Sequence, residues 1–521
     1  MKKHPKALEP FTLFLTVVTA VLGAIIGMQI LVTLGITPTT SIIGALIAVV
    51  VSRIPIQIFK KYRSVHRQNL IQTSISSATF GAANSLLIPI GIPFLMGKTE
   101  LILPMLIGAT LAMFVDAMML YKLFDSKIFP ASGTWPLGVA TAESIVAGDQ
   151  GGKRAGLLGV GVTGGLLGSF LGVPMSAFGV AFIGNIWALT MFGVGMLVSG
   201  YSTPLFGIDL NELYIPHGFM IGAGVVAFIQ VFRVIFKKKE TSGENEEATT
   251  TKSDQDMSRT LKFGFLAYLI VILIISVISG LITHMSLGMF IAYLLFATLA
   301  AFAHELIVGI AAMHSGWFPA FAVALITLVV GVLIGFPPLA LGLLAGFSAS
   351  TGAAFADMGY DLKTGYQLRG NGKDPKFELE GRKQQLITGM IAFGVAVLAV
   401  LFTYQGFFAQ GLVPPVDKVY VATIDAGVSG DTAWTLLMWA IPGALLQWIG
   451  GPGRQLGVLF ATGMLLVNPA AGWAVLAGIL IRFIVLKWKG KKAESSMSVM
   501  AAGFIAGDAL YSFFSSLFKM K

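Results

Sequence analysis

Several stretches of the chain stay apolar for longer than a helix of a soluble domain requires. Examples are "FTLFLTVVTAVLGAIIGMQILVTLGI" (Phe11 to Ile36), "FGFLAYLIVILIISVISGLI" (Phe263 to Ile282) and "FPAFAVALITLVVGVLIGF" (Phe318 to Phe336). A helix of about 20 apolar residues crosses the roughly 30 Å hydrocarbon core of a bilayer. Only 12% of the 521 residues are charged, against about 25% in soluble domains. The sequence predicts an all-α polytopic membrane protein with roughly 14 to 16 transmembrane helices, some of them re-entrant or broken.

The charge and the composition limit which partners and cofactors are expected. The formal net charge of +10 is spread over short connections between spans, so we expect the lipid bilayer as a partner and no nucleic acid. Basic residues cluster at the start of the chain and in "RIPIQIFKKYRSVHR" (Arg53 to Arg67). The positive-inside rule places both clusters, and the N-terminus, on the cytoplasmic side of a cell membrane, inner or plasma. With no cysteine and six histidines, we expect no disulfide, no metal centre and no cofactor.

Two polar stretches interrupt the apolar pattern. "KKKETSGENEEATTTKSDQDMSRT" (Lys237 to Thr260) predicts a flexible hydrophilic cytoplasmic linker. It separates a first transmembrane half, residues 1–236, from a second half, residues 261–521. A second stretch, Ala356 to Gln385, is interpreted as a cytoplasmic loop, either a gating part or a tolerated insertion.

One segment of eleven residues occurs twice in related form, about 280 residues apart. "VATAESIVAGD" (Val139 to Asp149) and "VATIDAGVSGD" (Val421 to Asp431) share six of eleven positions, and Glu143 corresponds to Asp425. "TFGAA" (Thr79 to Ala83) and "STGAA" (Ser350 to Ala354) precede them in the same order. Transporters are often built from such repeats, with the substrate site at their interface near the midplane. The pattern favours two related halves and leaves parallel and inverted orientations open.

The doubled stretch carries the first candidate site. Its surroundings are too polar and too rich in Pro and Gly for a lipid-facing helix, which indicates a re-entrant or interrupted segment beside a cavity. Glu143 and Asp425 are predicted to face that cavity as proton carriers or substrate ligands, with Asp149 and Asp431 at its far end. The alternative places all four acids in solvated turns or at helix ends.

Further polar residues are candidates for the substrate pathway. His217 begins an apolar run, and either binds substrate or protons or lies at the membrane surface. Asn84, Gln68 and Gln72 either hydrogen-bond substrate or join helices. Asp508 is a charge inside an apolar run, with a gate or a buried ion pair as its functional interpretation.

Three other features are given weaker interpretations. Arg482 is interpreted as extending toward the membrane surface near Lys487, with a gate or a buried ion pair as the alternative. Asp116 is either buried or at the membrane surface. "GVGVTG" (Gly159 to Gly164) fits a dinucleotide pattern literally but lies inside an apolar span, so it is interpreted as helix packing.

Two segments resemble a known family. "WPLGVATAESIVAGDQGG" (Trp135 to Gly152) is similar to a signature of bacterial members of the oligopeptide transporter (OPT) superfamily, and "AAGFIAGDALYSFFSSL" (Ala501 to Leu517) resembles the end of its yellow stripe-like branch. The peptide branch's Asn-Pro-Gly and Lys-Ile-Pro-Pro-Arg motifs do not occur in this sequence. The resemblance implies a many-span permease that imports peptides or metal chelates with protons.

These observations together predict a secondary active transporter, with proton-coupled uptake of small peptides or metal chelates by alternating access. A sodium-coupled carrier or an exporter of another small solute is the alternative. An integral membrane enzyme is disfavoured, because neither a Gly-x-Ser-x-Gly elbow nor a metal-binding helix occurs. The sequence leaves open the substrate, the coupling ion, the direction of transport and the oligomeric state, a homodimer included.

Overall fold

The computed structural model describes residues 3–35, 40–53, 57–133, 135–149, 152–241, 251–315, 320–428, 430–490 and 492–519. Within these ranges the chain is built from helices, apart from a single bridge between Phe124 and Phe129. The α-helices of the first half are α1 (Pro10–Leu34), α2 (Thr40–Arg53), α3 (Val65–Phe80), α4 (Ile88–Leu95), α5 (Ile102–Leu123), α6 (Pro136–Asp149), α7 (Gly152–Phe170), α8 (Met175–Ile183), α9 (Ile186–Phe206) and α10 (Ile215–Thr241). Those that follow are α11 (Asp254–Ile278), α12 (Leu287–Ser315), α13 (Ala320–Ile334), α14 (Pro338–Ser350), α15 (Ala353–Leu368), α16 (Pro375–Ala409), α17 (Pro415–Val428), α18 (Gly430–Arg454), α19 (Leu456–Leu465), α20 (Pro469–Lys489) and α21 (Lys492–Lys519).

The helices confirm the predicted class. In the described residues, ten helices or helix pairs are long and apolar enough to cross a membrane, and five shorter apolar helices accompany them. Together they agree with the expected 14 to 16 segments, partial spans included. The protein is an all-α polytopic membrane protein.

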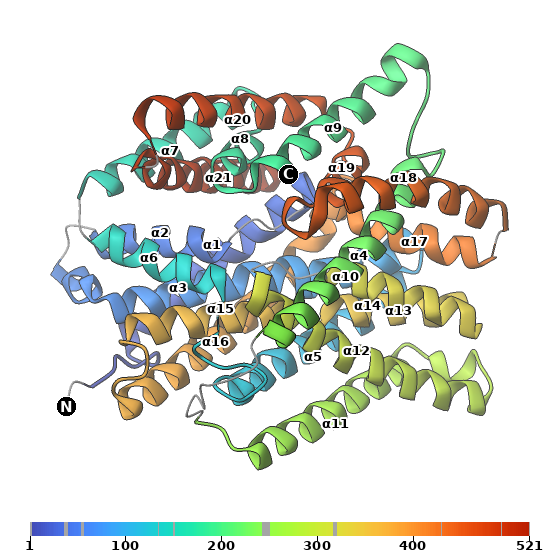
Figure 1. Cartoon of the computed structure of the whole chain (residues 1–521), viewed down its shortest axis with the longest axis horizontal. Helices are drawn as coiled ribbons and strands as arrows, with labels where there is room; N and C mark the ends of the chain where they lie inside the picture. The colour runs from blue at the N-terminus through green and yellow to red at the C-terminus, as the bar shows by residue number, and fades with distance from the viewer. Residues whose placement is uncertain are drawn as a thin grey trace.

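Two interrupted spans form the centre of the molecule. The first is Val65–Leu95, which contains α3 and α4, and the second is Pro338–Leu368, which contains α14 and α15; each is 31 residues long. These two spans and α1 are the three most buried of the long spans. α3 packs on α15 and α4 packs on α14, so the two spans run antiparallel. Figure 1 shows them crossing the middle of the bundle.

Both spans are interrupted at the matching sequences. "TFGAA" lies where α3 gives way to a π-helical turn, Gly81–Leu87, and "STGAA" lies at the break between α14 and α15. The π-helix inserts an extra residue per turn and so redirects the backbone. At the second break Gly352 has φ +90°, a conformation that disfavours side chains with a Cβ. Helix interruptions at this depth require polar partners from neighbouring helices.

Two short helices of equal length approach the centre from opposite ends. α6 follows a loop that bonds to Thr251 and Arg382, on the end of the bundle where the N-terminal Ala7 bonds to Gln384. α17 begins at Pro415, which packs against Gly35 at the end of α1, on the other side. α6 packs on α15, α2 and α3, whereas α17 packs on α4, α13 and α14.

Helices α7 to α10 and α18 to α21 form a bundle beside this centre (Figure 1). α7 packs along α21 and α10 along α18, while α8 lies against α20 and α21, and α9 against α19 and α20. Small residues permit the close approach, since a Cβ on Gly165 would stand 2.5 Å from the carbonyl oxygen of Phe504. Gly161 faces Gly503 and Gly165 faces Gly507 across the interface, so both helices carry the Gly-x-x-x-Gly spacing typical of membrane helix pairs. The helix-packing interpretation of "GVGVTG" agrees with these contacts.

Two interpretations of polar stretches need correction. Residues 356–368 are not a loop: they belong to α15, which is almost wholly buried. The hydropathy of this helix is low because of its polar side chains, and these side chains can be buried because they meet polar partners on α3 and in the loop before α6. Thr251 and the residues after it are also ordered: Ser253 and Asp256 form a capping box that starts α11 at Asp254, inside the predicted linker.

Arg482 also differs from its preferred interpretation. Its side chain is buried and does not extend to the membrane surface. One terminal nitrogen donates to the carbonyl oxygens of Ala181 (3.2 Å) and Gly184 (2.7 Å) at the end of α8, and the other pairs with Glu494 at 3.3 Å. Carbonyl groups at a helix end lack partners within the helix and attract a cation.

Candidate functional site

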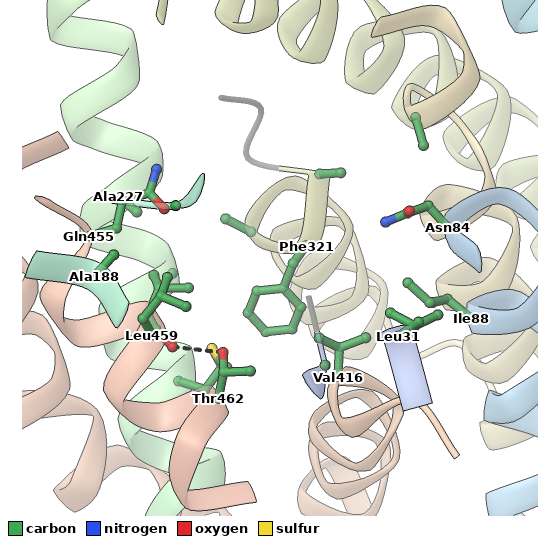
Figure 2. A pocket seen from close by; sticks show the side chains of 18 of the residues that line it. Leu31, Asn84, Ile88, Ala188, Ala227, Phe321, Val416, Gln455, Leu459 and Thr462 are labelled. Carbon is green, nitrogen blue, oxygen red and sulfur yellow. Dashed lines mark hydrogen bonds between the residues drawn. The ribbon is translucent and has the colours of Figure 1, made fainter. Parts of the chain in front are cut away.

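A cavity of about 340 Å³ lies between the interrupted spans and the bundle of α8, α9, α10 and α19. This volume is within the range typical of small-molecule sites. Its wall takes residues from both halves of the chain, as Figure 2 shows for Leu31, Asn84 and Ile88 on one side and Leu459 and Thr462 on the other. The ring of Phe321 stands between these two groups (Figure 2). The cavity is therefore placed where a substrate would contact both halves.

The cavity wall is mostly apolar and carries no charged side chain among the residues the structure describes. Its polar groups are the amides of Asn84, Asn185 and Gln455 and the hydroxyls of Thr462 and Tyr420. The Thr462 hydroxyl donates to the carbonyl oxygen of Val458 (2.8 Å). Pockets of this kind hold a ligand by shape and by a few oriented polar contacts.

Both helix interruptions reach the cavity. Asn84 belongs to the π-helical turn of the first interrupted span, and its Oδ1 atom has no hydrogen-bond partner in the described part of the chain. Ala349 and Ala353 flank the break at Gly352 in the second span, and both line the cavity. The two irregular segments therefore meet the same space.

Two buried carboxylates lie along the first contact between the spans. Asp357 accepts a hydrogen bond from Ser76 (2.5 Å). Asp361 accepts from Gln72 (2.6 Å) and from Ser77 (3.3 Å). Because the Ser76 hydroxyl already donates its hydrogen bond to Asp357, Ser41 must be the donor in the 2.8 Å contact between Ser41 and Ser76.

A second polar cluster surrounds the break between α14 and α15. Asp116 on α5 accepts from the backbone N–H of Gly352 (2.7 Å) and from the hydroxyl of Tyr268 on α11 (2.5 Å). His304 on α12 contacts the hydroxyl of Ser348 through Nδ1 at 3.2 Å. Asp116 is therefore buried, the first of its two expected settings, and it satisfies a backbone group that the helix break leaves free.

The predicted pathway amides have different surroundings. Asn84 lines the cavity. Gln72 is buried away from it and donates to Asp361, which is the helix-joining interpretation. Gln68 is also buried and donates to the carbonyl oxygen of Arg63 (3.2 Å).

Three of the four acids of the doubled stretch do not line this cavity. Glu143 on α6 and Asp425 on α17 have exposed side chains, and so does Asp431 in the first turn of α18. Asp149 ends α6, and its side chain lies outside what the structure describes. Their predicted role in carrying protons or binding substrate stays a prediction.

His217 and Asp508 lie outside the cavity wall. His217 is buried in the first turn of α10, with its ring 5.5 Å from that of Tyr214 and its Nδ1 without a partner among the described residues. Asp508 on α21 accepts from the hydroxyl of Ser169 and from the backbone N–H of Ser176 (2.7 Å). A carboxylate at the start of α8 satisfies an N–H that a helix leaves free.

Sequence reasoning missed the buried acids Asp357, Asp361, Glu305 and Asp417, which are all fully buried. The spacing of Asp357 and Asp361 was a usable signal, since residues four apart share one helix face. The chain around them was interpreted as a loop, so this signal was not used. Glu305 is a charge inside an apolar run, as Asp508 is, so the same signal was present and was not used. Asp417 stands beside Lys418, and nothing in the pattern around it indicated burial.

The comparison with known families agrees with this architecture. The model of the family described as "OPT oligopeptide transporter protein" matches residues 10–231 and 211–519. The chain belongs to the OPT oligopeptide transporter family. The resemblance in its sequence is thus confirmed at the level of the family, and this OPT protein is a membrane transporter. That assignment is consistent with the expectation that it is not an enzyme. No curated protein matches the OPT chain closely enough to narrow its substrate.

Proposed function

We propose that this OPT protein imports small peptides or metal chelates together with protons, by alternating access around the central cavity. The observation that carries the proposal is that both helix interruptions, at Asn84 and beside Gly352, meet this one cavity. In secondary transporters, substrate sites are typically formed by discontinuous helices near the midplane. Movement of one half against the other would then open the cavity to each side in turn.

We also infer that the two halves form an inverted repeat. The spans 65–95 and 338–368 have equal length and run antiparallel, and each carries the matching sequence at its interruption. Under this correspondence α6 matches α17 and α4 matches α15. The contact of α6 with α15 in one half therefore has its counterpart in the contact of α17 with α4 in the other. In the same way α7 matches α18 and α10 matches α21, so the α7–α21 contact is the counterpart of the α18–α10 contact. We infer that α11 is the additional crossing that inverts the second half.

The cavity wall favours a substrate with no net charge. An uncompensated charge buried against neutral amides and apolar side chains is costly. A zwitterionic peptide carries one charge of each sign, and a metal chelate balances the ion with its carboxylates. Of the two pools, we expect the neutral members to be taken up in preference to strongly charged ones.

Glu143 and Asp425 are the proposed proton carriers, with Asp149 and Asp431 at the ends of their segments. Their support is their place on α6 and α17, which approach the centre from opposite ends. An exposed carboxylate on such a helix can exchange protons with an aqueous path. His217 and Asp508 remain proposed parts of the pathway, with less support, because each lies outside the cavity wall.

The orientation and the membrane are proposed from charge. The end of the bundle that holds Ala7 also holds Lys60, Lys61, Arg63 and Arg67. By the positive-inside rule this end faces the cytoplasm of a cell membrane. A homodimer is a further proposal, to be tested by the mass of the purified protein in detergent.

Uptake into proteoliposomes tests the proposed function. The wild type and a Glu143→Gln/Asp425→Asn variant face pooled short peptides and, separately, pooled metal chelates under an inward proton gradient. We expect the wild type to concentrate members of one pool and the variant to lose gradient-driven accumulation. A sodium gradient serves as the parallel arm: accumulation driven by sodium alone would contradict proton coupling, and unchanged accumulation in the variant would remove both acids from the mechanism.

A matched pair of variants tests the cavity. Asn84→Leu removes an amide from the cavity wall and is expected to raise the KM for uptake. Gln410→Leu, at the exposed end of α16, is the control and is expected to leave the KM unchanged. An unchanged KM in Asn84→Leu would place the substrate elsewhere.

A further inference from the structure

Glu305 is a fully buried acid to which none of the roles above has been given. It lies within α12, and neither carboxyl oxygen has a hydrogen-bond partner in the part of the chain that the structure describes. The Tyr268 hydroxyl lies beside it, and Asp116 acts on it electrostatically. A carboxyl group at this depth that is satisfied by nothing is rare and calls for an explanation.

Among the residues that the structure describes, no positive charge compensates this cluster. The side chains that act on Glu305 are Asp116 from α5 and Tyr268 from α11. His304, its neighbour on α12, is turned toward the hydroxyls of Ser348 and Thr351. From α6, α10, α13 and α15, which also pack on α12, no described charged side chain acts on Glu305. Two ionised carboxylates without a cation would carry a large desolvation penalty at membrane depth.

The hydrogen bonds determine which acid is ionised. Asp116 accepts two hydrogen bonds, from the N–H of Gly352 (2.7 Å) and from Tyr268 (2.5 Å). These contacts stabilise its carboxylate form. A tyrosine hydroxyl has one proton to donate, and here Asp116 receives it. Glu305 can therefore make a favourable contact with the Tyr268 oxygen only by carrying a proton of its own.

We propose that Glu305 is a proton-binding site, joined through Tyr268 and Asp116 to the helix break at Gly352. The proton is taken from water on one side of the membrane by the Glu305 carboxylate and returned to water on the other side. When Glu305 loses its proton, the Tyr268 hydroxyl turns to donate to Glu305, because Asp116 keeps the Gly352 N–H whereas the Glu305 carboxylate has no other donor among the described residues. Asp116 is left with the Gly352 N–H alone.

The coupling consequence rests on the proposed function. Ala349 and Ala353 on either side of the break line the cavity, so a change in the hydrogen bonds at Gly352 reaches the proposed substrate site. The state of one proton on Glu305 would thereby be linked to the shape of the cavity wall. This site differs from the proposed carriers Glu143 and Asp425, whose side chains are exposed.

Infrared difference spectroscopy of the purified full-length protein tests the site without any substrate. At neutral pH the wild type should show a protonated-carboxyl carbonyl band that is absent in Glu305→Gln. The band should persist in Glu100→Gln, a matched change at an exposed position. Tyr268→Phe should shift the band, because the hydrogen-bond partner of the protonated acid is lost. Should Glu305→Gln fail to fold, the response to Tyr268→Phe decides. A band unchanged in Glu305→Gln, or in Tyr268→Phe, would overturn the proposal.

A transport measurement separates this inference from the proposed function. In proteoliposomes Glu305→Gln should still exchange substrate between equal pools, while accumulation driven by a proton gradient falls to the level reached without a gradient. If Glu305→Gln accumulates substrate as the wild type does, Glu305 is not the coupling site. If the wild type itself accumulates nothing under a proton gradient, the proposed function fails, and the infrared band still decides whether Glu305 holds a proton.

Discussion

Replacing Gly222 by alanine should separate two helices of the bundle by a predictable distance. Gly222 lies on α10 against α18, and a Cβ there would stand 1.8 Å from the carbonyl oxygen of Ala440. Ordinary contact begins at 3.4 Å, so the helices must move apart locally by about 1.6 Å, the difference between these two distances. The obstacle is backbone and cannot rotate away. Overpacking of this kind costs about 1–3 kcal/mol, and we expect the upper part of that range.

The same displacement should reach the cavity. Met220 and Gly224 lie two positions on either side of Gly222 and both line the cavity wall. We therefore expect Gly222→Ala to lower the midpoint of thermal unfolding and to raise the KM for uptake. The midpoint is measured in detergent at one fixed scan rate, because large membrane proteins commonly unfold irreversibly.

The control is Gly156→Ala on α7, where a Cβ would meet nothing within 4 Å. This change keeps the intrinsic gain of up to about 1 kcal/mol from replacing glycine in a helix, so its midpoint should equal or exceed that of the wild type. If Gly222→Ala unfolds at the same temperature as Gly156→Ala with an unchanged KM, the close α10–α18 contact is refuted.

Three further perturbations have expected outcomes. Glu378→Gln leaves the buried guanidinium of Arg369, now held at 2.7 Å, without its counter-charge, and should cost about 3–5 kcal/mol; a melting point within error of the wild type would contradict this. Asn84→Asp places a charge in the neutral cavity wall and should lower uptake of uncharged substrates about tenfold or more; equal uptake would exclude Asn84 from the site. Burial favours a higher pKa for Asp125, but the hydrogen bond from Thr251 and the charge of Arg382 hold that pKa below its usual value. Its contribution to stability is therefore complete above the pKa of the unfolded chain, 3.8, and is lost as the pH falls through the lower folded value. The melting-point difference between wild type and Asp125→Asn should be constant at neutral pH and close in acid; a difference that closes as the pH rises would reverse the sign.

The fold class and the family could be predicted from the sequence because both are written locally. A run such as Phe11 to Ile36 is apolar at every turn and long enough to cross a bilayer, and several such runs in one chain indicate membrane spans. The doubled sequence and the "TFGAA" and "STGAA" pair also identified the segments where the structure places its short helices and interruptions. Glycine spacing on α7 was correctly interpreted as packing, because the span around it was apolar throughout.

The polar residues were harder to place, and α15 shows why. Its sequence contains Asp357, Asp361 and Lys363 within two turns, which by hydropathy indicates a solvated loop. The structure buries all three, because Gln72 and the carbonyl oxygens of the loop before α6 supply partners from distant parts of the chain. A hydropathy pattern describes a side chain without its partners, so a fully satisfied polar helix looks exposed.

By itself, the sequence determined that this is a membrane protein, that it is helical, and that it belongs to the OPT transporters. The first two properties follow from the free energy of transferring each apolar run into lipid, which depends on the run alone, and the third follows from the motifs at Trp135 to Gly152 and Ala501 to Leu517. Only the tertiary structure decided that Asn84 and the Gly352 break meet one cavity, that the matching spans run antiparallel, and that Glu305 lies beside Tyr268 with no cation in the described part of the chain. Each of these is a contact between helices far apart in the chain, and its energy exists only once both partners are in place.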